Sequence, residues 1–217
     1  TPSIARWTDE PYDTGASSAR QSTCTRWNGK YATKVEWLRD RLVTPMLTLS
    51  LLRHGKSSWD DPDMEDRLRP LADRGRRAAR KMGAYMERHG LVPGLILYSD
   101  AVRTIETLEL VLSEFPPPRP PAQPEPALYL APASTMLEFV QRTPPTVQHL
   151  LVLGHNPGMH GLALHLTGSG LRRDIATMAT KFPTCALAVL TFDAISWSEV
   201  RPAGGRLNRF VLPRTLA

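Results

Sequence analysis

The apolar pattern of this chain changes type several times, and this alternation limits the possible folds more than any other feature. Short apolar runs at 46–52, 95–98 and 150–153 are typical of buried strands. Between them, apolar residues recur at helical spacing, most clearly over 71–89 and 102–112. Because strands that alternate with helices form a sheet covered on both faces, the sequence predicts a three-layer α/β fold with a mainly parallel central sheet.

Weaker patterns predict further elements in the second half of the chain. These are a strand at 127–130, a helix at 134–142, a helix that ends near Leu166, a buried strand at 185–192, and possible edge strands at 197–200 and 206–212. Seven prolines between Pro116 and Pro126 indicate a surface connector without regular structure.

Residues 1–45 differ in composition from the rest of the 217-residue chain. Ser, Thr, Asp and Arg dominate there, and only a short stretch around Leu38 shows an apolar period. We therefore expect a loosely ordered N-terminal extension over 1–45, followed by one functional domain over 46–217.

Composition excludes several classes of protein. Cys24 and Cys185 allow at most one disulfide, so a cytoplasmic location is favoured. No apolar stretch approaches the ~18 residues of a membrane span, which predicts a soluble protein without a membrane partner. The net charge of +6 favours anionic substrates, but the arginines are scattered and not interleaved with aromatic residues, so no nucleic-acid partner is expected. The oligomeric state stays open.

Unusual polar residues follow three of the predicted strands. Arg53 and His54 come after the first strand, Arg103 lies in the segment 99–104 after the second, and His155 and Asn156 follow the run at 150–153. Because the carboxyl ends of parallel strands meet at one edge of a sheet, these side chains should form a compact cationic site suited to phosphate. No Cys/His spacing or acidic cluster indicates a metal, and no cofactor is expected.

These motifs, together with Arg69-Pro70-Leu71 ahead of a glycine-containing helix, make residues 46–213 resemble the histidine phosphatase (phosphoglycerate mutase-like) superfamily, and within it the small SixA-type phosphohistidine phosphatases. The resemblance implies that His54 is the nucleophile, that Arg53 and Arg103 clamp the phosphoryl oxygens, and that His155 is the second histidine of the catalytic pocket. Asn156 is expected among the phosphate-binding residues.

Two departures from the family pattern concern the proton donor. Many relatives carry a phosphate-binding asparagine five residues after the Arg-His-Gly glycine, where this chain has Asp60. Relatives that cleave phosphate esters carry a glutamate near the third strand, whereas residues 127–131 contain no acid. Asp60 is then the candidate catalytic acid, and Glu138 is a poorer candidate. The alternative for both residues is a non-catalytic role as a solvated or helix-capping carboxylate. Since phosphoramidates need a proton donor far less than esters do, this pattern favours N–P cleavage.

The short segment 131–148 leaves no room for a lid insertion, so the site should be open to a phosphorylated side chain of another protein. The sequence thus predicts a metal-independent phosphatase that uses a phosphohistidine intermediate, with protein phosphohistidine as its favoured substrate. A general phosphomonoesterase acting on small phosphorylated molecules is the alternative enzyme, and a non-catalytic phosphate-binding module is the alternative without catalysis.

Overall fold

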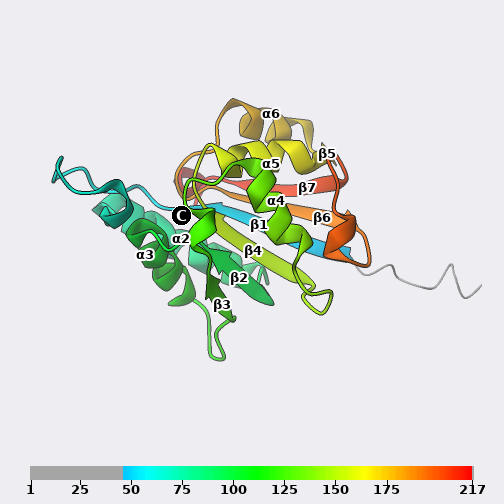
Figure 1. The fold of residues 1–217 in the computed structure, drawn as a ribbon, viewed down its shortest axis with the longest axis horizontal. Coiled ribbons are helices and arrows are strands. Elements are labelled where there is room, and N and C mark those ends of the chain that lie inside the picture. The colour runs from blue at the N-terminus through cyan, green and yellow to red at the C-terminus, as the bar shows by residue number, and fades with distance from the viewer. Residues whose placement is uncertain (1–45, 217) are drawn as a thin grey trace, which may run out of the picture. The chain divides into compact units, whose positions relative to one another are not determined.

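A computed structural model describes residues 46–216 and places seven strands in one sheet, in the order β3-β2-β4-β1-β6-β7-β5 (Figure 1). The strands are β1 (Met46–Arg53), β2 (Leu95–Tyr98), β3 (Ala122–Pro124), β4 (His149–Gly154), β5 (Thr167–Gly170), β6 (Leu187–Asp193) and β7 (Gly205–Val211). Among these strands, β6 alone runs against the others. The expected mainly parallel α/β sheet is therefore confirmed.

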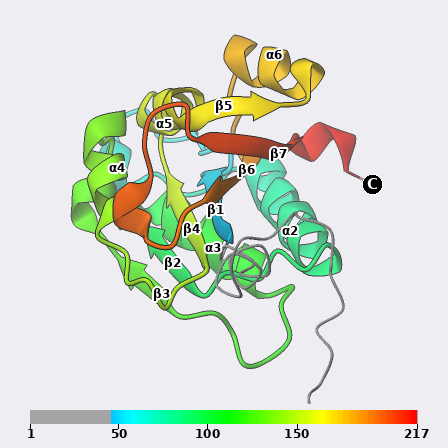
Figure 2. The same cartoon turned by 90° about the vertical axis from the view of Figure 1, so that its right-hand side faces the viewer.

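Helices cover both faces of this sheet. They are α2 (Asp73–Arg88), α3 (Val102–Leu112), α4 (Ala133–Gln141), α5 (Gly158–Leu166) and α6 (Arg172–Thr180), with short 3₁₀ turns η1 (Asp66–Leu68), η2 (Pro126–Leu128), η3 (Trp197–Glu199) and η4 (Pro213–Thr215). Helices α2 and α3 pack on one face, whereas α4 and α5 lie on the other (Figure 2). This arrangement gives the three predicted layers.

The two faces of the sheet divide the core, because successive strand residues point to opposite sides. Leu49 and Leu51 of β1 pack in the cluster that contains α4 and α5. Leu52 and, on β4, Leu151 belong to the cluster of α2 and α3. All four are fully buried. The central strands β1 and β4 are thus apolar on both sides, which explains why their runs are so distinct in the sequence.

The third strand does not lie where the sequence predicted it. Residues 127 and 128 of the expected strand at 127–130 belong to η2, and β3 is instead Ala122–Pro124, inside the proline-rich connector. Proline is tolerated there because β3 is an edge strand that pairs only with β2. All three residues of β3 are exposed, so the strand has no apolar pattern to reveal it.

Two further expectations near the C-terminus also need correction. Residues 197–199 of the expected edge strand at 197–200 form η3, in which Trp197 is fully buried and its indole nitrogen donates to the Val147 carbonyl oxygen at 2.7 Å. The strand at 206–212 exists as β7, but β5 rather than β7 lies at that edge of the sheet. Neither the polar strand β5 nor α6 was expected.

The path between β3 and β4 contains only η2 and α4, which agrees with the absence of a lid insertion. The expected N-terminal extension over 1–45 lies outside the described residues. Within the described part of the chain, no helix is both long enough and apolar enough to cross a membrane.

Candidate active site

Three loops meet at the carboxyl ends of β1, β2 and β4 because the strand register brings them together. Arg53, the last residue of β1, is paired with Gly154 at the end of β4, and the His54 amide donates to the Gly154 carbonyl oxygen at 3.1 Å. On the other side of β4, the Ser99 amide donates to the Leu153 carbonyl oxygen at 3.1 Å. The loops that carry the predicted site residues therefore begin next to one another.

His54 is held as a neutral imidazole with one free nitrogen. Its Nδ1 lies 2.7 Å from the Gly55 carbonyl oxygen, so Nδ1 bears the proton and Nε2 keeps its lone pair. Burial, and then the nearby His155, lower the pKa of His54 to about 3. The charges of Arg103 and Arg53 lower the pKa of His54 further, as lesser causes. A neutral imidazole at physiological pH is what a nucleophile requires.

His155 lies against His54, with 4.9 Å between the ring centroids. Its Nε2 is 2.8 Å from the Ser99 hydroxyl, and its Nδ1 is buried without a hydrogen-bond partner among the described residues. Burial, and then Arg103, lower the pKa of His155 to about 4. When Ser99 donates to Nε2, the ring proton stands on Nδ1, which can donate it to a phosphate oxygen.

The two arginines place positive charge beside the histidines. Nη1 of Arg53 donates to the Phe182 carbonyl oxygen at 2.9 Å, while its Nε is buried without a partner among the described residues. Burial and the charge of Arg103 lower the pKa of Arg53. Arg103 is only 4% exposed. Two like charges this close favour an anion that contacts both of them.

Asp66, a carboxylate that the sequence did not single out, forms an ion pair with Arg103. Both terminal nitrogens of Arg103 donate to Asp66, one to its backbone oxygen and one to Oδ2 at 2.8 Å. The Tyr129 hydroxyl donates to the same Oδ2 at 2.7 Å, and the Tyr129 ring meets His155 edge-on with 5.4 Å between centroids. Burial raises the pKa of Asp66, but the hydrogen bonds from Tyr129 and Arg103 together outweigh it, so the pKa is lowered and Asp66 is ionised at neutral pH.

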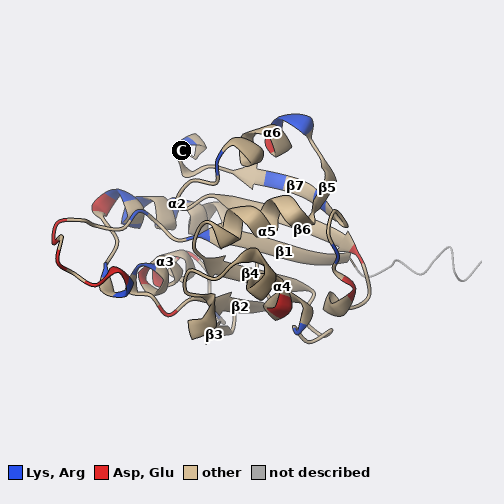
Figure 3. Cartoon of the chain, turned by 45° about the horizontal axis from the view of Figure 1, so that its top comes forward, with Lys and Arg blue, Asp and Glu red and all other residues tan. Residues whose placement is uncertain are grey.

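Nothing in the sequence separates Asp66 from its acidic neighbours. Five carboxylates lie in the loop 60–66, which Figure 3 shows as a largely acidic segment, and only the η1 turn brings one of them to Arg103. Tyr129 lies within residues 127–131, which contain no acid. Its hydroxyl is the only polar side-chain group of that segment, and this is the signal in the sequence that points to Tyr129.

The remaining predicted residues lie in different surroundings. Asp60 is exposed and accepts a hydrogen bond from the Ser58 hydroxyl at 2.7 Å. Glu138 pairs on α4 with Arg142 at 3.2 Å. Nδ2 of Asn156 donates to the Phe182 carbonyl oxygen at 3.0 Å, the same oxygen that Arg53 contacts. Their catalytic and phosphate-binding roles stay predictions.

Two glycines allow the close backbone approaches that shape the site. A Cβ on Gly158, the first residue of α5, would lie 1.9 Å from the Ala131 carbonyl oxygen. A Cβ on Gly75 would lie 2.3 Å from the Lys56 carbonyl oxygen. These contacts fix the loop of His155 against the segment of Tyr129, and α2 against the chain that follows His54.

Within residues 46–216, no group of three or more His, Cys, Asp or Glu side chains is arranged to hold a metal ion. The chemistry that this site supports directly is anion binding by two arginines, with attack by the free Nε2 of His54. That combination suits transfer of a phosphoryl group to a histidine.

Comparison with known proteins gives the same result. The family model of the histidine phosphatase superfamily (branch 1) matches residues 49–129. Rv1276c, an uncharacterized protein of Mycobacterium tuberculosis, is 34% identical over 165 residues, which cover 75% of this chain and all of that protein. The uncharacterized chloroplastic protein At3g52155 of Arabidopsis thaliana is 32% identical over 177 residues, which cover 76% of this chain and 77% of the relative.

Among solved structures, one assigned to the phosphohistidine phosphatase SixA of Agrobacterium tumefaciens has a TM-score of 0.65 and 27% sequence identity, and covers 77% of this chain and 98% of its own. The family match includes Arg53, His54 and Arg103, and the similarity to the SixA structure covers about three quarters of this chain. The chain is therefore a phosphatase that belongs to the histidine phosphatase superfamily, with the SixA-type members as its structural relatives.

Proposed function

We propose that this phosphatase removes phosphoryl groups from phosphohistidine side chains of proteins, through a covalent intermediate on His54. The observation that carries this proposal is the state of Asp66. This carboxylate contacts Arg103 and has a lowered pKa, so it has no proton to give to a leaving alkoxide at neutral pH. A phosphohistidine whose ring carries a proton departs as a neutral imidazole and needs no such donor.

In the first step, the Nε2 lone pair of His54 attacks the phosphorus atom of the substrate. The P–N bond to the substrate breaks, and its electron pair stays with the departing imidazole. Nδ1 of His54 keeps its proton and donates a hydrogen bond to the Gly55 carbonyl oxygen, which stabilises the cationic phosphorylated ring. Arg53, Arg103 and Nδ1 of His155 neutralise the charge on the three equatorial phosphoryl oxygens.

In the second step, water attacks the phosphorus of the phosphorylated His54. The P–N bond breaks, and its electron pair returns to Nε2. One proton leaves the attacking water, and the Asp66 carboxylate is the base that lies against the phosphate-binding arginine. Inorganic phosphate then departs, Asp66 releases the proton to solvent, and the ionised carboxylate pairs with Arg103 again.

A protein substrate is supported by the surface beside the site. Trp59 is 61% exposed in the loop that follows β1, and the guanidinium of Arg69 lies 4.2 Å from the centre of its ring. Arg69 itself is only 5% exposed, so the exposed group is the Trp59 ring, and aromatic side chains are enriched at protein interfaces. We also propose action in the cytoplasm, although the Arabidopsis relative is named chloroplastic.

The test is a side-by-side assay of the purified chain on a phosphohistidine-carrying protein and on an alkyl phosphate. Phosphohistidine turnover should be faster by ~10² to 10⁴, the usual contribution of a general acid that the ester would lack. Equal rates on both would contradict the proposal and favour a small-molecule phosphomonoesterase.

The His54→Ala variant is the control for the intermediate. Acid-labile phosphate should appear on the wild-type chain in a quenched reaction and be absent from this variant. The variant should still bind phosphate weakly through Arg53 and Arg103. Turnover of His54→Ala near the wild-type rate would rule out the proposed nucleophile.

A further inference from the structure

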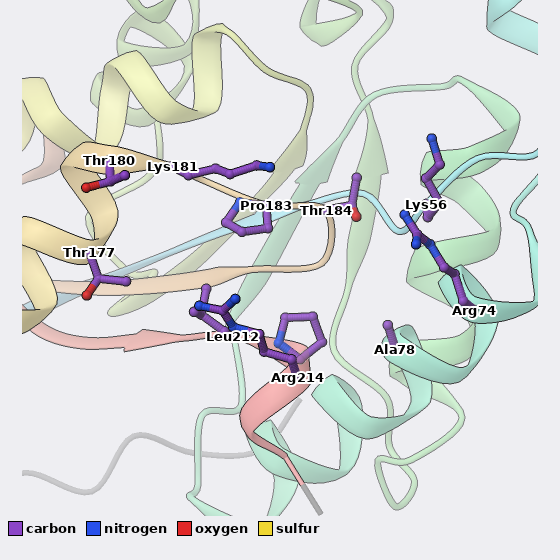
Figure 4. Close-up of a pocket in the computed structure, with 11 residues that line it drawn as sticks. Lys56, Arg74, Ala78, Thr177, Thr180, Lys181, Pro183, Thr184, Leu212 and Arg214 are labelled. Carbon is purple, nitrogen blue, oxygen red and sulfur yellow. The ribbon is translucent and has the colours of Figure 1, made fainter.

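A second pocket with a cationic lining lies beside the active site. It has a volume of about 780 Å³ and is bounded by α2, the end of α6, the loop that leads to β6, and the C-terminal turn η4 (Figure 4). Its charged lining residues are Lys56, Arg74, Lys181 and Arg214, and no carboxylate lines it. This volume falls within the range of pockets that bind small molecules.

The positive charge of this pocket is not compensated nearby. None of its four cations forms an ion pair with a carboxylate of residues 46–216. Two other arginines of α2 do form ion pairs, Arg76 with Glu106 and Arg80 with Glu114. Like charges gathered in a concave site focus the electrostatic potential and attract anions.

The pocket and the catalytic site share the loop 181–184. On the catalytic side, the Phe182 carbonyl oxygen accepts hydrogen bonds from Arg53 and Asn156. Its neighbours Lys181, Pro183 and Thr184 line the second pocket. The two sites are thus adjacent, but they use different side chains, so an anion in one does not occupy the cations of the other.

We propose that this pocket is a second anion site, which binds a small molecule with two or more linked phosphate groups. A single phosphate can neutralise only part of the charge of four cations, whereas a chain of phosphates can contact several of them at once. Lys181 extends toward the open space of the pocket in Figure 4, and Arg74 and Lys56 lie together on its opposite side. This spacing favours an extended anion over a compact one. The proposal does not depend on the identity of the phosphatase substrate.

Calorimetric titration of the full chain with tripolyphosphate tests this site. The Arg103→Gln variant weakens anion binding in the catalytic pocket, so the binding that remains reports the second pocket. In the Arg103→Gln background we expect one binding site for tripolyphosphate. Addition of Lys181→Gln and Arg214→Gln should lower the affinity of this site by about tenfold or more. Both of these side chains are exposed, so the melting temperature should stay unchanged.

The matched control removes the same charge elsewhere, with Arg119→Gln and Arg201→Gln, two exposed residues outside the pocket. This pair should change the affinity less than twofold. Equal weakening by both pairs would show a general charge effect and overturn the proposal, as would failure of tripolyphosphate to bind the Arg103→Gln chain.

Two further arms complete the test. If Arg103→Gln does not fold, the same titration uses the wild-type background. The wild type should then bind tripolyphosphate at two sites, and the double variant Lys181→Gln and Arg214→Gln at one. Two sites of unchanged affinity in the double variant would overturn the proposal. A glutamate-rich peptide is titrated in parallel. Binding of the peptide in the pocket without binding of tripolyphosphate would make this a protein-docking surface and refute the small-molecule assignment.

Discussion

Replacement of Asp66 by asparagine separates two effects of this carboxylate. Asparagine keeps nearly the same shape and can still accept hydrogen bonds from Tyr129 and Arg103, but it carries no charge and is a very weak base. Arg103 then loses its counter-ion, and the second chemical step loses its proton acceptor. We therefore expect tighter phosphate binding together with slower turnover.

The size of each effect follows from the exposure of the Asp66 side chain and from its proposed role as a base. The Asp66 side chain is 49% exposed, so its pairing with Arg103 is screened and worth ~1 kcal/mol at most. Loss of this competitor should therefore tighten binding of a phosphate analogue such as tungstate by up to about fivefold. Loss of the base should lower kcat by ~100-fold or more.

The assay measures kcat, KM and tungstate inhibition on a phosphohistidine protein, with the amount of phosphorylated His54 determined in quenched samples. If Asp66 acts in the second step, the phosphorylated enzyme accumulates in Asp66→Asn. The same replacement at Asp60 tests the carboxylate that the sequence favoured. An unchanged kcat in Asp66→Asn, or a selective loss in Asp60→Asn, would refute the role given to Asp66.

Three further predictions concern stability. Burial lowers the pKa values of His54, His149 and His155 well below 6.5. Below pH 6.5 the unfolded chain therefore binds more protons than the folded chain. For each of these histidines, the free energy of unfolding should fall by ~1.4 kcal/mol per pH unit as the pH drops from 6.5 toward about 4. Urea unfolding checks this, and a stability independent of pH in this range would contradict it. Gly158→Ala should cost ~2 kcal/mol because the new Cβ meets the Ala131 carbonyl oxygen, whereas Gly161→Ala, with its nearest contact at 3.4 Å, should cost nothing; equal melting temperatures would contradict this. A chain that begins at Met46 should keep its cooperative unfolding and phosphatase rate, and loss of either would show that residues 1–45 are structural.

The sequence was sufficient to predict the elements that form the centre of the sheet. Strands β1, β2 and β4 are apolar because both of their faces are covered, and each ends at the residues that form the site. Because the carboxyl ends of parallel strands meet at one edge of a sheet, the sequence also predicts that Arg53, Arg103 and His155 lie close together. Where burial determines the pattern, sequence reasoning succeeded.

Sequence reasoning failed for features that have no apolar pattern of their own and depend on contacts with distant residues. The edge strand β3 is fully exposed and contains proline, and β5 consists of threonine, serine and glycine, so neither has an apolar signature. The place of Asp66 depends on the η1 turn, which has no buried residue of its own. Such features depend on tertiary packing and cannot be read from local periodicity.

Asp66 also explains how Arg103 can be buried before substrate arrives. A guanidinium that is 4% exposed is costly to keep without a partner, and the two histidines beside it are neutral and offer no compensating charge. Asp66, which is half exposed, supplies that charge from the surface turn η1. In the proposed mechanism a bound phosphoryl group competes with Asp66 for Arg103, so its affinity would reflect the difference between the two anions. In the proposed mechanism the dianionic phosphoryl group contacts Arg53 as well as Arg103, whereas the Asp66 carboxylate pairs with Arg103 alone, and this second contact would give the substrate its advantage.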